Sequence, residues 1–115
     1  MIIIQSNIVK IISFGFAQAI TIFPFIIMKN KDKEIILNHE KIHYKQQKEL
    51  LIIGFFLLYL LEYLIRIIQY KSFNQAYYNI SFERECFDNQ IYYNYLQHRK
   101  MFSFLKYIKE NGIYR

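Results

Sequence analysis

The hydrophobic pattern of the first 28 residues predicts β-strands. Ile2–Gln5 and residues 8–12 are short runs rich in β-branched side chains, as in strands that a turn connects. Over residues 13–23 large and small side chains alternate with period two, which is typical of a half-buried strand. Pro24 ends that strand or places it at an edge, because proline has no N–H to donate. An apolar helix over residues 8–28 is the alternative interpretation.

After residue 30 the pattern becomes helical. Residues 30–33 are polar and predict a loop in which Asp32 caps the next helix. From Lys33 to Lys71 only Gly54 interrupts the helical pattern, so we expect one very long helix or two consecutive ones. Residues 71–75 predict a second loop.

A C-terminal helical region follows this second loop. Ser81 is a favourable N-cap, and Glu83 and Glu85 lie in the first turn, where the helix dipole stabilises anions. We expect this helix to extend to about Arg99, and a short amphipathic segment to cover residues 102–109.

Length and composition favour one folded domain. The chain has 115 residues, of which 54% are hydrophobic and 19% aromatic, which excludes an intrinsically disordered protein. Its single cysteine excludes the class of disulfide-rich domains. We therefore predict one α+β domain over residues 1–115, mainly helical. Residues 1–28 hold the strands, 33–70 the long helical region and 81–109 the C-terminal helices.

The net charge of +6 is spread along the chain, and the aromatic residues sit in apolar runs rather than beside basic ones. A nucleic-acid surface needs basic residues and exposed aromatics on one face, so we expect no nucleic-acid partner. Lysines that precede an apolar run would suit an anionic membrane surface.

Residues 50–68 are long and apolar enough to raise the question of a membrane. Only Glu62 and Arg66 are charged in this stretch of 19 residues, and about 20 suffice to cross a bilayer. The two charges are four apart and can pair on a helix. The segment is either a membrane-spanning helix or a core helix of a soluble protein. We expect a membrane-associated or integral membrane protein, with a cytoplasmic one as the alternative.

The strongest chemical signal is the sequence H-E-x-x-H, formed by His39, Glu40 and His43. On a helix, residues four apart share a face, so both imidazoles reach one metal ion. Glu40 then lies beside the ion and can accept a proton from water. Two of the three histidines have this spacing, which favours a zinc site over two unrelated surface histidines.

A catalytic zinc ion needs a third protein ligand and a free position for water. Glu83 and Glu85 can supply this ligand if their helix packs antiparallel to the H-E-x-x-H helix, and their spacing leaves the choice between them open. Ordinary acids at a helix start are the alternative explanation for this pair. The other downstream candidates are Glu62, Asp88 and His98.

These motifs, with Gln46-Gln47 after the second histidine and the sequence FEREC at residues 82–86, resemble the gluzincin metalloproteases, including the membrane members of prenyl-protease and heat-shock type. The resemblance covers about residues 17–86 at the level of motif order. It implies a Zn²⁺ cofactor. The implied ligands are His39, His43 and Glu83, with Glu40 as general base and Glu85 as a supporting carboxylate.

The resemblance also has consequences for the fold. It implies a small N-terminal antiparallel sheet over the active-site helix, with residues 17–23 as the edge strand that binds a peptide substrate in extended form. The long apolar helix and a C-terminal helix with the third ligand complete this gluzincin-like fold. Two departures concern the metal site: Cys86 stands where a small Ala is usual, and Phe87 where an Asp often orients a ligand histidine.

We therefore predict a zinc-dependent metallopeptidase that hydrolyses peptide bonds of a peptide or protein substrate. The developing oxyanion needs a hydrogen-bond donor, and Tyr77, just before the Glu83 helix, is the candidate. The alternatives are a non-catalytic small membrane or structural protein with a vestigial or absent metal site, and a regulatory, toxin-like interaction module.

Overall fold

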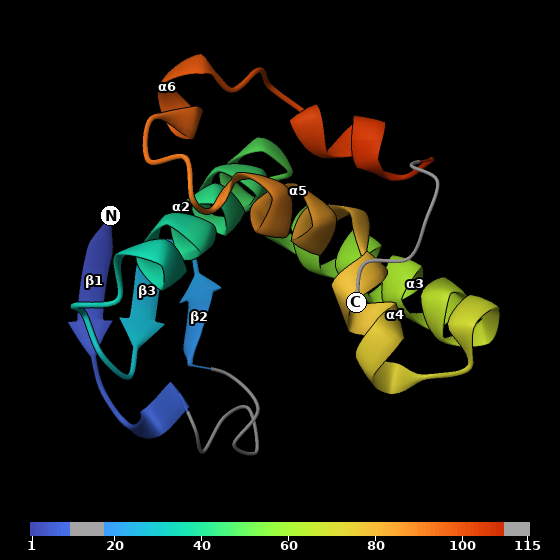
Figure 1. The fold of residues 1–115 in the computed structure, drawn as a ribbon, viewed down its shortest axis with the longest axis horizontal. Helices are drawn as coiled ribbons and strands as arrows, with labels where there is room; N and C mark the ends of the chain where they lie inside the picture. Colours follow the sequence, from blue (N-terminus) through green and yellow to red (C-terminus); the bar gives the residue numbers. More distant parts are fainter. Residues whose placement is uncertain (10–17, 110–115) are drawn as a thin grey trace.

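A small sheet and a group of helices lie at opposite ends of the molecule, and the helix that carries the H-E-x-x-H sequence lies between them (Figure 1). The computed structural model describes residues 1–9 and 18–109. It is an α+β fold in which helix predominates, as predicted.

Three strands form the sheet: β1 (Ile2–Gln5), β2 (Ala19–Ile22) and β3 (Phe25–Met28), in the order β1-β3-β2. β2 and β3 are antiparallel because only Phe23 and Pro24 separate them, whereas β1 runs parallel to β3. The prediction of an antiparallel sheet is therefore wrong for β1, which pairs with the side of β3 that β2 leaves free.

The predictions for residues 8–23 have mixed outcomes. The predicted strand is observed from Ala19 on, as an edge strand that ends before Pro24. Ile8 and Val9 are helical, so the strand expected over 8–12 is wrong at its start, and residues 10–17 lie outside the described part. The alternative apolar helix over 8–28 is wrong from residue 19 on, because β2 and β3 occupy that stretch.

Helix α2 (Glu34–Glu49) packs across β2 and β3. The small-residue face of β2 turns toward this helix, so that Thr21 is buried, whereas Ile22 on the opposite face is exposed. Since α2 begins at Glu34 with Lys33 as its N-cap, Asp32 lies one residue too early to cap it, contrary to the prediction.

The helical stretch after residue 33 forms two helices, α2 and α3 (Ile53–Tyr70). The break falls at residues 50–52, where Leu51 and Ile52 have positive φ angles of 57° and 66°. Gly54 is not the breaking residue: a Cβ there would lie 3.6 Å from the Leu50 Cβ, an ordinary contact. Branched side chains at positive φ are strained, so the chain context rather than a local glycine imposes this turn.

The next helices are shorter than predicted. α4 (Phe73–Asn79) begins inside the predicted loop 71–75, because the Ser72 hydroxyl caps it by accepting a hydrogen bond from the Gln75 N–H at 3.2 Å. α5 (Ser81–Asn89) ends ten residues before Arg99, the predicted end. Two short elements follow it: α6 (Tyr95–His98) and the 3₁₀ helix η1 (Ser103–Tyr107).

The start of α5 is capped from another helix. Ser81 is the first residue of α5 rather than its N-cap, and its N–H and hydroxyl both donate to the Glu62 carboxylate, at 2.6 and 2.5 Å. Glu62 also pairs with Arg66 at 3.2 Å, as predicted. The Glu62 carboxylate of α3 therefore caps α5, in place of the Ser81 side chain that the sequence suggested.

A hydrophobic cluster of Phe55, Ile80, Phe82 and Phe104 holds α3, α5 and η1 together. On the sheet side, Ile26, Met28 and Ile42 are fully buried between β3 and α2. The contact between α2 and α5, in contrast, is lined by polar side chains, and these form the candidate site.

Candidate metal centre

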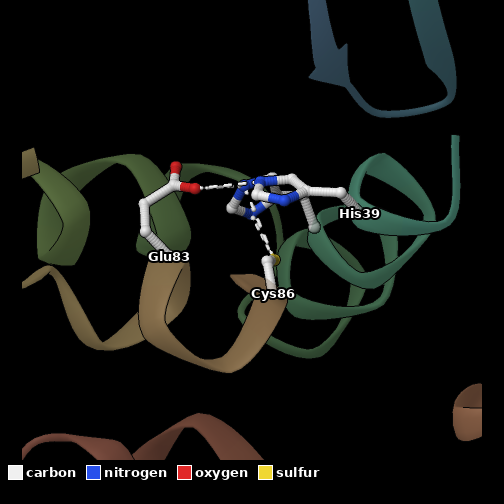
Figure 2. Close-up of side chains that lie close together, drawn as sticks. His39, Glu83 and Cys86 are labelled. Atoms are coloured by element: carbon white, nitrogen blue, oxygen red, sulfur yellow. Dashed lines mark hydrogen bonds and ion pairs between the residues drawn. The ribbon is translucent and has the colours of Figure 1, made fainter. Parts of the chain in front are cut away.

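Two adjacent helices bring the predicted ligands together. His39 and His43 lie one turn apart on the face of α2 that meets α5, and Glu83 lies in the first turn of α5. The Nε2 atoms of His39 and His43 are 3.0 and 3.1 Å from the same Glu83 oxygen, Oε1 (Figure 2). The three side chains predicted as ligands thus converge on one point.

This point is shielded from water. His39, His43 and Glu83 are all buried. Burial alone would raise the pKa of Glu83, but the two imidazoles outweigh it and lower that pKa well below its usual range. Glu83 is therefore ionised, and a buried negative charge needs a positive partner.

The hydrogen bond of His43 determines which of its nitrogens faces the centre. Gln46 Nε2 donates to the Phe82 carbonyl at 3.1 Å and to the Glu85 carboxylate at 3.0 Å, and both groups accept only. The Gln46 Oε1 atom must then be the one that faces His43 Nδ1, at 2.8 Å. Nδ1 therefore donates to Gln46, and Nε2 is the nitrogen that faces the centre.

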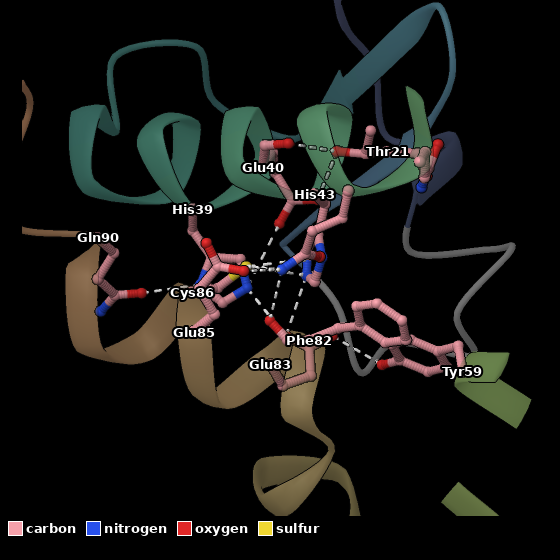
Figure 3. Close-up of polar contacts among 12 residues, drawn as sticks. Thr21, His39, Glu40, His43, Tyr59, Phe82, Glu83, Glu85, Cys86 and Gln90 are labelled. Atoms are coloured by element: carbon pink, nitrogen blue, oxygen red, sulfur yellow. Dashed lines mark hydrogen bonds and ion pairs between the residues drawn. The ribbon is translucent and has the colours of Figure 1, made fainter. Parts of the chain in front are cut away.

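His39 has the same arrangement, with its Nδ1 atom 2.8 Å from Gln90 Oε1 (Figure 3). Gln90 reaches this position because α5 stops at Asn89. The Asn38 amide donates to the carbonyls of Gln90 and Tyr92, at 2.7 and 3.2 Å, and so holds the turn that replaces the predicted continuation of α5.

When both imidazoles are neutral, three acceptor atoms meet at the centre: two imidazole lone pairs and a carboxylate oxygen. Acceptors this close repel one another unless a proton or a cation lies between them. In a metal site, imidazole ligands usually donate their other N–H to a fixed acceptor, and Gln46 and Gln90 are such acceptors. The buried cluster can therefore hold a metal ion.

Cys86, one turn after Glu83, belongs to the same cluster. Its sulfur lies 3.6 Å from both ring nitrogens of His43, and burial raises its pKa to about 12. A sulfur equidistant from the two nitrogens lies beside the ring rather than beyond Nε2, where a bound ion would lie. As placed, Cys86 packs against the ring.

Glu40 lies next to the centre without joining it. One carboxylate oxygen accepts a hydrogen bond from the Thr21 hydroxyl at 2.9 Å, and the other is 4.0 Å from His39 Nε2. The small-residue face of β2 thus positions the acid predicted as general base (Figure 3).

Two tyrosines lie near Glu83, and Tyr59 is the one that contacts its carboxylate. The Tyr59 hydroxyl donates to Glu83 Oε2 at 2.7 Å, which leaves Oε1 for the centre. Tyr77 stacks edge-on with Phe87, whose ring in turn packs on His39. Burial, together with the carboxylates of Glu83 and Glu40, raises the pKa of Tyr77 well above its usual value, so its hydroxyl remains a hydrogen-bond donor.

Glu85 points away from the centre. It accepts hydrogen bonds from Tyr95 and Arg99 and from Gln46, at 2.7, 2.5 and 3.0 Å. Arg99 also pairs with Glu49 at 2.6 Å. Between the two glutamates that the spacing left open, the structure places only Glu83 at the centre, and Glu85 supports it through Gln46.

The remaining candidate ligands lie elsewhere. Glu62 is the cap of α5, and Asp88 and His98 are exposed on α5 and α6. The place of the orienting Asp is taken by Gln90, which lies 2.8 Å from His39 Nδ1.

The edge of β2 is partly occupied. The side chain of Gln47 donates to the Thr21 carbonyl at 2.7 Å and accepts from the Phe23 N–H at 2.8 Å. It therefore pairs with the strand much as a neighbouring strand would. An extended peptide that added to this edge would be limited to the part beyond these two groups, toward Ala19.

Sequence reasoning missed several contributors to the site: Gln46, Gln90, Tyr59, Thr21 and the placement of Cys86. Glutamine and tyrosine carry no ligand signature, and each acts only because the fold brings it to a ligand. A polar residue at i+3 from the second histidine was the one available signal for Gln46.

No family model, curated protein or solved structure matches this chain. The functional argument therefore depends on the geometry of the site.

Proposed function

We propose that the protein is a zinc-dependent peptidase of gluzincin type. The observation that carries this proposal is the approach of His39 Nε2 and His43 Nε2 to one oxygen of Glu83, with each Nδ1 held by a glutamine. Two nitrogens and one carboxylate oxygen are the donor set of known catalytic zinc sites, which keep a fourth position for water. The position of Cys86 beside the His43 ring agrees with such an open site.

Zinc in such a site supplies Lewis acidity, which makes water more acidic and a carbonyl more electrophilic. Glu40, which Thr21 holds beside His39, accepts one proton of the attacking water. The water oxygen bonds to the peptide carbonyl carbon, Glu40 passes the proton to the amide nitrogen, and the C–N bond breaks. The products are a carboxylic acid and an amine, and the proton of the acid then passes to the amine. The protonated hydroxyl of Tyr77 is the proposed donor to the developing oxyanion.

The experiment compares Glu40→Gln with Glu34→Gln. Glu34 lies exposed in the first turn of the same helix, so it is a matched control. Glu40→Gln should keep one zinc ion per chain and lose peptide hydrolysis by about 10²–10⁴-fold, and Glu34→Gln should change neither. Hydrolysis that survives Glu40→Gln would contradict the proposed role of Glu40.

A non-catalytic metal site is the second candidate, and the inclusion of Cys86 in the cluster favours it. If the sulfur moves onto the ion, four protein ligands close the site, which is typical of structural zinc. Cys86→Ala separates the two functions. An open catalytic site keeps its zinc in this variant, whereas a closed structural site loses it.

We also propose that the protein acts at a membrane. Support comes from α3, which is long and apolar enough to cross a bilayer and has only 11% of its residues buried in the protein.

A further inference from the structure

The polarity of α3 is inverted relative to that of a helix on a soluble protein. The face that contacts the rest of the molecule carries Glu62, Arg66 and the tyrosines at 59 and 63 beside the buried Phe55, whereas the exposed face is apolar except for Gln69 near its end. The exposed apolar residues are Ile53, Phe56, Leu57, Leu58, Leu60, Leu61, Leu64, Ile65 and Ile68. Their spacing of three and four residues forms one stripe along the whole helix.

The polar face of α3 is bonded to the protein along its length. Near the start, Tyr59 donates to Glu83 of the candidate site. In the middle, Glu62 caps α5 through Ser81. Farther on, Arg66 donates to the Ile108 carbonyl at 3.0 Å. These contacts fix the helix on the protein and fix the direction in which its apolar stripe points.

The same contacts are incompatible with α3 as a single membrane-spanning helix. To surround α3 with lipid, the protein would have to release Glu62 and Arg66 from their partners and expose both to hydrocarbon, which is costly for charged side chains. With the contacts intact, α4 remains packed against the inner face and α5 remains bonded to it through Ser81, so only the outer stripe can enter lipid. A helix of this kind lies in the plane of the interface.

The composition of the stripe distinguishes lipid from a protein partner. Eight of its nine residues are Leu or Ile, and the ninth is Phe. Protein–protein interfaces are enriched in Tyr, Trp and Arg, and here the tyrosines and the arginine face inward. Basic residues lie close to both ends of the helix, Lys48 before it and Lys71 after it. The net charge of +6 also complements an anionic membrane surface.

We propose that α3 lies parallel to an anionic lipid bilayer with its outer stripe inserted at the boundary between headgroups and acyl chains, and does not span it. This inference rests on the proposed membrane location and specifies how α3 contacts the lipid. It predicts a monotopic protein, with the candidate metal centre behind α3 on the side that faces away from the lipid.

The first experiment measures binding to vesicles of phosphatidylcholine with and without phosphatidylglycerol, by flotation. The variant Leu57→Gln/Leu61→Gln/Leu64→Gln changes the stripe. The matched control Ile91→Gln/Tyr92→Gln/Met101→Gln changes three equally exposed apolar residues elsewhere. We expect binding that anionic lipid strengthens, a loss of at least tenfold in the stripe variant, and a change under twofold in the control. Equal losses in both variants, or a stripe that pairs two copies of the chain in light scattering without lipid, would overturn the proposal.

The second experiment distinguishes in-plane from spanning geometry. Single cysteines at positions 53, 61 and 68 carry a nitrobenzoxadiazole fluorophore; Cys86 is fully buried and stays unlabelled. In-plane seating predicts similar shallow quenching by spin-labelled lipids at all three positions, and complete reduction of all three by dithionite added outside. A spanning helix gives deep quenching at position 61 and protects one end from dithionite.

These readouts use neither zinc nor peptide hydrolysis, and Glu40→Gln can serve as host protein. A failure of the peptidase proposal therefore leaves them unchanged. Absence of vesicle binding contradicts the membrane location itself, and binding with a depth gradient along α3 contradicts only the in-plane geometry.

Discussion

The contact between α2 and α5 and the outer stripe of α3 reverse the usual rule for soluble proteins. The first buries charged and polar side chains, among them Glu83, His43 and Glu85, and the second exposes leucines and isoleucines to the surroundings. Both arrangements are unfavourable for stability in water alone. Each makes sense when something outside the chain completes it: a cation in the first region and lipid in the second.

Substitutions in the buried cluster and on the outer stripe of α3 should differ most in their effect on the free energy of unfolding. Phe82→Ala removes a ring from the buried cluster with Phe55 and Phe104 and should lower the free energy of unfolding by about 3–5 kcal/mol. Leu61→Gln on the outer stripe should change it by no more than about 0.5 kcal/mol. Urea unfolding in lipid-free buffer measures both. A large loss in Leu61→Gln would show that the stripe is packed in solution.

Removal of one proposed ligand should reduce the free energy of zinc binding by nearly as much. His39→Ala should weaken zinc binding by about 3–4 kcal/mol, a few hundredfold, because a ligand contributes roughly that share of the total. His98→Ala, which changes the exposed histidine of α6, is the control and should have no effect. Competition with a chromogenic chelator measures both affinities, and equal affinities would remove His39 from the site.

Loss of the hydrogen bond to His43 should have a smaller effect. Gln46→Met keeps the side-chain length but leaves His43 Nδ1 and Glu85 without their partner, so zinc affinity should fall by about 10–100-fold. Gln47→Met is the matched control, since Gln47 bonds to β2 instead. The same titration would contradict the tautomer argument if the two variants bound zinc alike.

The smallest expected effect is the change in zinc affinity with each pH unit. Burial alone would lower the pKa of His43, but Cys86 and Glu83 outweigh it and raise that pKa well above its usual value. In the metal-free protein a proton therefore occupies Nε2 and competes with zinc. Affinity should rise about tenfold per pH unit up to this raised pKa and then level off.

Isothermal titration calorimetry in buffers of different ionisation enthalpy would count the released proton. A pH-independent affinity above pH 6.5 would contradict the account.

The sequence predicted the side chains that converge at the centre better than their surroundings. The spacing of His39 and His43 specifies one face of a helix, whatever the rest of the fold does. Glu83 and Glu85 are two residues apart and point to different sides of α5, so the choice between them depends on how α5 packs. Gln90 reaches His39 only because Asn38 holds the turn after α5, and such a tertiary contact leaves no local pattern.

Helix boundaries and faces were harder to predict for the same reason. Leu51 and Ile52 adopt positive φ angles without a glycine, so the break between α2 and α3 carries no sequence signal. An almost continuous apolar run hides which side of α3 faces the protein. The inverted polarity appears only once Glu62 and Arg66 are seen to face Ser81 and Ile108.

X-ray absorption at the zinc edge tests the central claim most directly, because it reports the atoms bound to the ion in the purified protein. The account predicts two imidazole nitrogens and oxygen ligands at about 2.0–2.2 Å, with no sulfur at about 2.3 Å. A protein that binds no zinc, or a zinc–sulfur distance from Cys86, would contradict an open site formed by His39, His43 and Glu83.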